Sequence, residues 1–186
     1  MNFNEHSSLK GMHAILSPSS YHWIRYKDRD RFEKFVRGKE AIRKGTEDHE
    51  FACLCIQRKQ RLPKSKATLN MYVNDAIGFR MEPEQPLVYS ENCFGTADAI
   101  LFDERKKKLR IHDLKTGATP ASMDQLMIYA AIFCLEYKIK PSDITVELRI
   151  YQNNEITVYE PDFKELTETI DQVIFANKMV NEILDV

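Results

Sequence analysis

The chain has 186 residues, enough for one compact domain with a full hydrophobic core and too few for two comfortable ones. A content of 43% apolar and 30% charged residues excludes a disordered chain or a fibre, and no apolar run approaches the roughly 20 residues that cross a bilayer. The formal net charge of −1 argues at first against a nucleic-acid partner. However, residues 1–70 carry 15 Lys and Arg against 8 Asp and Glu, whereas residues 71–186 carry 12 against 20. A basic half of this kind is typical either of a solvated helix surface or of a site for a polyanion.

The N-terminal part is predicted to be helical. A serine cap at residues 17–20 precedes apolar residues at helical spacing as far as residue 36. Gly45-Thr46 is typical of a second helix start, and Pro63 is expected to end that helix. Its apolar stripe is predicted to consist of three residues: Phe51, Leu54 and Cys55. A third helix is predicted over residues 68–81.

After Pro86 the pattern changes to that of strands. Three strands are predicted, at residues 87–89, 94–103 and 108–115. Thr119-Pro120 indicates a helix start, and that helix is expected to run to about residue 137. The remaining predicted elements are a hairpin of residues 144–151 and 156–159 across Asn153-Asn154 and a final helix at roughly 162–184.

This order of elements predicts an α+β fold with α/β-like connections, in which helices flank a central mixed β-sheet in a single domain. Within it we expect three parts. They are a mostly helical basic part over residues 1–82, a sheet-and-helix catalytic core over residues 86–160 and a C-terminal helix over residues 161–186.

Two carboxylates occur where strand alternation favours apolar side chains. Asp113 and Lys115 share a strand face with Leu109 and Ile111, and Asp98 shares one with apolar residues of the preceding strand. If the two strands are hairpin neighbours, Asp98 and Asp113 lie close together and repel unless a divalent cation neutralises them. The pattern therefore predicts a Mg²⁺ site for phosphodiester hydrolysis, with Lys115 orienting the attacking water and stabilising negative charge. The alternative is a structural Asp113–Lys115 ion pair.

The flanking helices carry further candidates. Gln125 and Tyr129 are four residues apart, so they project from the same helix face, where they could hold a phosphate or water or form an ordinary surface pair. His49 is a candidate third metal ligand that favours Mn²⁺ over Mg²⁺, and Glu50 beside it is the alternative.

Together these residues resemble the PD-(D/E)XK nuclease superfamily, in particular its RecB-type and lambda-exonuclease-like branch. The resemblance rests on His49, the Gly95–Ala99 strand with Asp98, the Asp113–Gly117 stretch and the Gln125-x-x-x-Tyr129 helix. Small phage and prophage proteins of this branch also share the serine-rich start at residues 17–23 and Gly-Thr-x-x-His at residues 45–49. The similarity runs from about Ser17 to Tyr137, and the last fifty residues carry no motif.

The resemblance implies a restriction-endonuclease-like core and metal-dependent cleavage of DNA, often exonucleolytic, in recombination or end processing. It assigns Asp98, Asp113, His49 and the Leu114 carbonyl to the metal, Lys115 to catalysis, and Gln125 and Tyr129 to substrate or water. Some relatives hold an iron–sulfur cluster with three C-terminal cysteines. No cysteine follows Cys134 here, so this cluster is not expected.

We therefore expect a Mg²⁺- or Mn²⁺-dependent DNA exonuclease, with endonuclease activity left open. The alternatives are a nuclease-like module that binds DNA or protein without cleavage, and a phosphatase acting on small substrates. The expected partners are DNA and a single-strand annealing or recombination protein, with no membrane partner. Some related exonucleases form ring-shaped homo-oligomers. The cysteine spacing and the absence of a signal-peptide pattern predict reduced thiols and a cytoplasmic location, in a bacterial host if the chain is of phage origin.

Overall fold

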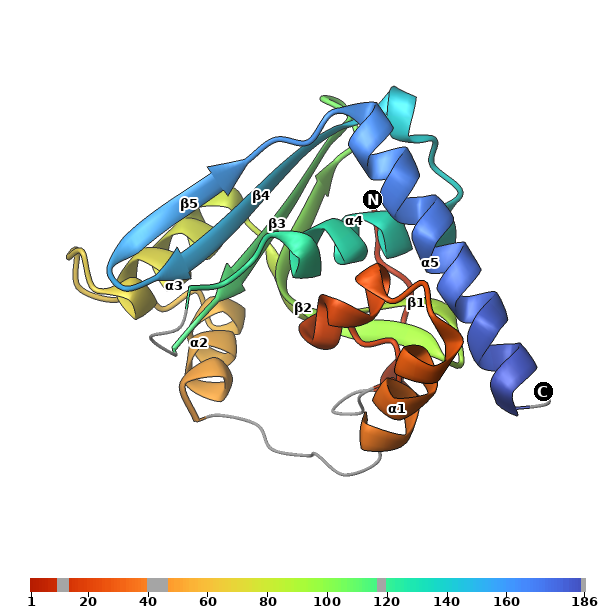
Figure 1. The fold of residues 1–186 in the computed structure, drawn as a ribbon. Coiled ribbons are helices and arrows are strands. Elements are labelled where there is room, and N and C mark those ends of the chain that lie inside the picture. Colours follow the sequence, from red (N-terminus) through yellow and green to blue (C-terminus); the bar gives the residue numbers. More distant parts are fainter. Residues whose placement is uncertain (10–13, 40–46, 117–119, 185–186) are drawn as a thin grey trace.

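Five strands form one sheet in the order in which they occur along the chain (Figure 1). The computed structural model describes residues 1–9, 14–39, 47–116 and 120–184. Its strands are β1 (Glu82–Ser90), β2 (Cys93–Asp103), β3 (Lys108–Leu114), β4 (Thr145–Gln152) and β5 (Glu155–Tyr159). Only β3 and β4 pair in parallel, and the crossover between them contains helix α4 (Asp124–Tyr137). The predicted α+β class, with a central mixed sheet flanked by helices in a single domain, is confirmed.

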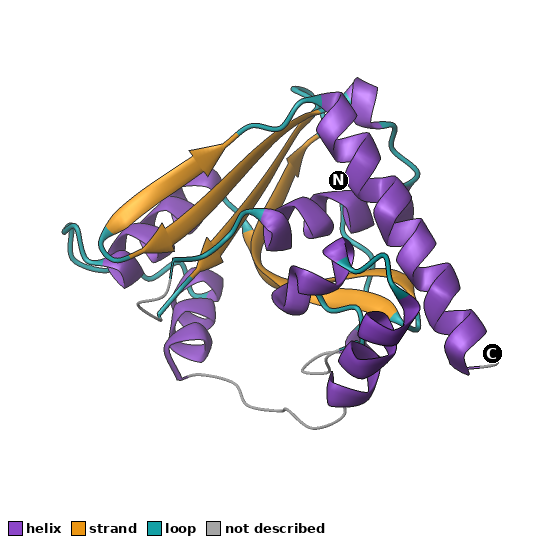
Figure 2. Ribbon diagram, viewed as in Figure 1, coloured by secondary structure: helices purple, strands orange, loops and turns teal. Residues whose placement is uncertain are grey.

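Helices cover both faces of this sheet (Figure 2). Helices α4 and α5 (Phe163–Leu184) pack on one face, and α2 (Glu47–Gln57) and α3 (Thr68–Phe79) belong to a second core on the other. Alternate residues of β3 serve the two cores, since Ile111 packs into the first and Leu114 into the second. Among the described helices, none combines the length and apolar character needed to cross a membrane.

The N-terminal region contains short helices where one continuous helix was predicted over residues 17–36. Over that range lie the 3₁₀ helix η2 (Pro18–Arg25) and the α-helix α1 (Arg29–Lys39), and the 3₁₀ helix η1 (Ser7–Leu9) precedes them. The prediction was wrong because the backbone adopts an extended conformation at Tyr26, which ends the first helix. Asp28 then caps a new helix by accepting a hydrogen bond from the Arg31 N–H at 3.1 Å.

Helix α2 buries a different face from the one predicted. Phe51 and Leu54 are each 47% exposed, so the predicted stripe is wrong for both. The buried residues are Ala52, Cys55 and Ile56, whose helical spacing turns them towards α3. The helix ends at Gln57, well before Pro63, and its predicted start at Gly45-Thr46 lies outside the described residues.

Helix α4 begins later than predicted. Thr119 lies outside the described residues, and Pro120 is not helical. The helix starts at Asp124, whose N–H is accepted by the Ser122 hydroxyl at 3.2 Å. A short 3₁₀ helix, η3 (Pro141–Asp143), then leads into the β4–β5 hairpin. The predicted Asn153-Asn154 turn is present, with positive φ angles of 51° and 62° that asparagine tolerates.

Candidate functional site

The carboxylates of Asp98 and Asp113 lie side by side on β2 and β3. The antiparallel register pairs Ala99 with His112, which brings Asp98 opposite Asp113 at the next position. The Leu114 N–H donates to Asp98 Oδ2 at 2.8 Å, which fixes that carboxylate beside the end of β3. The two aspartates that sequence alternation singled out are thus neighbours.

A third carboxylate, Glu84 of β1, extends this row and was missed by the sequence analysis. Pro83 pairs with Ala99 and Gln85 with Ala97, so Glu84 falls opposite Asp98. Pro83 and Pro86 interrupt any alternation here, and only edge strands such as β1 accept prolines in this way. Three adjacent strands therefore place one carboxylate each at the same level of the sheet.

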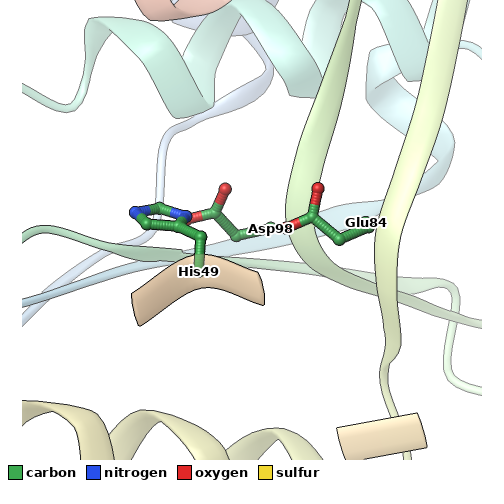
Figure 3. Close-up of side chains that lie close together, drawn as sticks. All are labelled: His49, Glu84 and Asp98. Carbon is green, nitrogen blue, oxygen red and sulfur yellow. The ribbon is translucent and has the colours of Figure 1, made fainter. Parts of the chain in front are cut away.

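His49 of α2 completes a cluster with Glu84 and Asp98 (Figure 3). One potential ligand atom from each of the three residues lies within 4.8 Å of the others, and His49 Nδ1 is 3.4 Å from Asp98 Oδ2. The hydrogen bond to Asp98 raises the pKa of His49 despite burial, and the charges of Asp98, Asp113 and Glu84 act in the same direction. Of the two alternatives at this turn of the helix, His49 faces the carboxylates and Glu50 is exposed.

On the other side of Asp98, the buried Asp113 and the half-buried Lys115 meet helix α4. Lys115 Nζ lies 3.1 Å from Asp113 Oδ1 and 3.0 Å from Oδ2, and it donates to Gln125 Oε1 at 2.6 Å. Asp113 is only 2% exposed, and burial together with the charge of Asp98 raises its pKa to about 7, against the opposing effect of Lys115 and His49. Gln125 thus holds the lysine ammonium from above the sheet.

The Tyr129 side chain contacts the main chain of strand β2. Its hydroxyl donates to the main-chain carbonyl of Thr96 on β2, and burial raises its pKa well above the usual value. Gly95 makes this contact feasible, because a Cβ there would lie 2.6 Å from Pro18 Cδ and 3.2 Å from Tyr129 Cε1. Tyr129 therefore orients the strand that carries Asp98.

The donor set fits a hard divalent cation. Carboxylate oxygens suit Mg²⁺ and Mn²⁺, and the imidazole nitrogen shifts the preference towards Mn²⁺. Asp113 Oδ2 is buried and accepts no hydrogen bond from the described residues, although the Lys115 ammonium lies beside it. Three carboxylates this close repel one another unless a cation is present.

Comparison with known proteins adds little to this picture. No model of a known protein family matches the chain, and neither does any curated protein. The crystal structure of SSO0001 is similar over 75% of this chain and 82% of that chain, with a TM-score of 0.31 and 13% sequence identity. A similarity this weak carries no functional meaning, so the residues of the site are what support a function.

Proposed function

We propose that the protein is a Mg²⁺- or Mn²⁺-dependent deoxyribonuclease that hydrolyses DNA phosphodiester bonds. The observation that carries this proposal is the row of Glu84, Asp98 and Asp113 across three strands, with His49 at one end and Lys115 at the other. A cation site next to a positioned lysine is the arrangement that phosphodiester hydrolysis needs.

The residues of the site divide into metal ligands and the lysine ammonium of Lys115. His49, Glu84 and Asp98, with Asp113 behind them, would hold the cation. When bound, a divalent cation polarises the phosphate and lowers the pKa of a bound water. The role of the Leu114 carbonyl as a further ligand remains part of the proposal.

Lys115 supplies positive charge at a defined point. Its ammonium is held between the Asp113 carboxylate and Gln125 Oε1, which fixes the direction of its remaining N–H. That N–H can orient the attacking water and stabilise the negative charge that develops on the phosphate. Gln125 and Tyr129 act as positioning residues, one for the ammonium and one for strand β2.

The choice of DNA as substrate rests on the exposed cations near the N-terminus. Four basic side chains of α1 and of the segment before it are exposed: Lys27, Arg29, Arg31 and Lys34. Such a series suits a long phosphate backbone better than a small phosphate ester, because each contact releases counterions. We favour an exonuclease, acting in phage-type recombination or end processing with a single-strand annealing partner, on the resemblance given above.

The test compares linear with closed circular DNA in the presence of Mg²⁺ or Mn²⁺. We expect degradation of the linear form only, and loss of that activity in both Asp113→Ala and Lys115→Ala while the circular-dichroism spectrum is retained. Cleavage of both forms would indicate an endonuclease. Calorimetric metal titration separates the binding-module alternative, since a protein that only binds DNA needs no Mn²⁺ affinity at Asp98.

The cysteines support a cytoplasmic location as part of the same proposal. Cys53, Cys55, Cys93 and Cys134 are all free, and three of them are buried. Free thiols persist in a reducing compartment, which is where a nuclease acting on intracellular DNA would work.

A further inference from the structure

A surface groove lies on the side of α4 away from Lys115. It has a volume of about 430 Å³ and lies between η2, α4, β5 and α5. Its walls combine three apolar and three acidic residues: Ile24, Met123, Met127, Asp124, Glu165 and Glu168. None of these belongs to the cation site, so the groove needs an explanation of its own.

The apolar part of the groove is adaptable. Ile24, Met123 and Met127 are only partly buried, and methionine side chains adjust readily to the shape of a partner. On α5 the exposed apolar surface continues beyond the groove, because Phe175 is 46% exposed and lies three residues after Gln172 of the groove wall. An apolar surface of this length, lined by flexible methionine side chains, suits a polypeptide segment better than a small rigid ligand.

The acidic part gives the groove a negative charge. Glu165 accepts hydrogen bonds from the Tyr159 hydroxyl at 2.5 Å and the Asp162 N–H at 2.9 Å, and these neutral donors leave its charge uncompensated. The Glu168 side chain forms neither an ion pair nor a hydrogen bond with any residue that the structure describes. Of the three carboxylates, only Asp124 forms an ion pair with a residue that the structure describes, and its partner Arg25 is 61% exposed. The groove therefore attracts cations and repels DNA.

A buried amide points to a peptide carbonyl in the same place. Gln172 lines the groove, and its Nε2 is buried without an acceptor among the described residues. An amide N–H without an acceptor is costly when water is excluded, and rotation of the side chain into the groove would let a main-chain carbonyl of a docked segment accept from it.

From these observations we infer that the groove between α4 and α5 docks a basic, amphipathic segment of a partner protein. Apolar side chains of the segment pack on the two methionines and Phe175, its Lys or Arg side chains pair with Glu165 and Glu168, and its backbone accepts from Gln172. Met123 directly precedes α4 and Met127 lies on it, so the partner docks beside the helix whose Gln125 contacts Lys115. The inference stands whether or not the chain cleaves DNA.

The probe is a synthetic helical peptide of about 14 residues with leucine and lysine on opposite faces, compared with its leucine–glutamate counterpart. Binding to the full chain is followed by fluorescence anisotropy at low salt. We expect saturable binding of the lysine peptide, at least about tenfold weaker binding of the glutamate peptide, and about fivefold or greater weakening in Glu168→Lys. Glu182→Lys is the matched control, because it makes the same change about 21 Å further along α5 and is expected to have little effect.

Gln172→Leu tests the role of the amide. We expect this variant to bind the lysine peptide more weakly while keeping the fold of the native chain. Equal binding of the two peptides, equal loss in Glu168→Lys and Glu182→Lys, or no saturable binding would each overturn the inference. So would self-association of the native chain that Glu168→Lys abolishes in sedimentation, because the groove would then hold a second copy of this chain.

Discussion

Glu84 adopts a backbone conformation that glutamate rarely takes. Its φ of 51° lies in the region that favours glycine, although the residue is part of strand β1. Strain of this kind persists where the surrounding structure holds it in place, and it is often found at functional sites. The side chain it presents is the third carboxylate of the row, opposite Asp98.

We expect Glu84→Gln to weaken Mn²⁺ binding on the order of tenfold, because ligand charge sets the affinity of such sites. Glu84→Gly should weaken it similarly and raise the stability of the metal-free protein by about 1 kcal/mol through relief of strain. Calorimetric titration and thermal unfolding measure the two effects. Glu82→Gln, an exposed glutamate of the same strand, is the control, and equal loss of affinity there would contradict a specific role for Glu84.

The metal-free protein should lose stability as the pH rises from about 4 to about 7. Burial raises the pKa of Asp113 to about 7, so folding favours its protonated form and ionisation costs stability over this range. His49 acts in the same direction, because its pKa is raised by Asp98 and the stabilisation is lost as the pH rises through that pKa. Asp113→Asn should therefore be more stable than the native chain at pH 8, by on the order of 2 kcal/mol, and nearly equal to it at pH 4.

Urea unfolding without metal at the two pH values measures this difference. Asp171→Asn, an exposed carboxylate of α5, should leave the pH profile unchanged. A difference between the native chain and Asp113→Asn that is the same at pH 4 and pH 8 would show that Asp113 is ionised without cost. Added Mn²⁺ at pH 8 should restore the lost stability in the native chain and not in Asp113→Asn.

The two aspartates could be found from sequence because each lies in a strand of regular alternation, and Lys115 because it directly follows β3 at the next position of the same alternation. Asp113 follows Leu109 and Ile111 on one face, and that regularity makes a charged residue conspicuous. Glu84 could not be found from sequence, because Pro83 and Pro86 obscure the strand pattern. Its positive φ could not be predicted either, because glutamate is not a residue type that favours that conformation. The contact of Tyr129 with β2 was equally invisible, since sequence spacing gives a helix face and not the atom that faces it.

At the scale of elements, a charged cluster joins the parallel strands β3 and β4 to α3. Glu147 accepts from Lys108 at 2.7 Å, from Arg110 at 3.1 Å and from Arg149 at 3.0 Å. Both guanidinium groups also lie over the ring of Phe79, at 4.7 and 5.0 Å. Burial opposes the charged form of Glu147, but these cations outweigh it and lower its pKa to about 2.

We expect Glu147→Gln to destabilise the protein by about 2–4 kcal/mol at pH 7, because three cations lose their shared partner. The lowered pKa means that this stabilisation is present above pH 4.5 and is lost as the pH falls towards 2, so the variant and native chains should converge there. Urea unfolding at pH 7 measures the full difference, and unfolding at pH 3 measures how far the two chains have converged. Glu160→Gln is the control, because Glu160 also pairs with Lys108 but its side chain is 62% exposed. If this variant lost more than about 1 kcal/mol of unfolding free energy, the importance of burial at Glu147 would be contradicted.

Whether a segment forms a helix or a strand could be predicted where the segment has one clear apolar face. The residues at which helices begin and end could not be predicted. The β2–β3 and β4–β5 hairpins follow from alternation and turn residues, as Asn153-Asn154 illustrates. Helix α2 offered two candidate faces, and only contact with α3 selects Ala52 over Phe51. The break at Tyr26 was hidden because residues on both sides continue the helical spacing, while Asp28 caps a new start.

At the scale of the whole molecule, the net charge of −1 conceals two regions of opposite sign. Exposed cations gather on α1 and the segment before it, whereas the chain after Asn153 carries 8 Asp and Glu against 2 Lys. If DNA contacts the first region, removing cations there weakens binding through lost counterion release, and removing them elsewhere does not. The salt dependence of binding therefore reports which region meets the phosphates.

We expect the double variant Arg29→Ala and Lys34→Ala to weaken DNA binding and to reduce the slope of log K against log[salt] by about 2, one for each lost contact. Binding is measured with chelator present, so that cleavage does not interfere. Lys164→Ala with Lys178→Ala removes the same number of charges from α5 and should leave the slope unchanged. Equal salt slopes in the two double variants would mean that DNA does not contact α1. DNA would then have to approach the row formed by Glu84, Asp98 and Asp113 over a different surface of the protein.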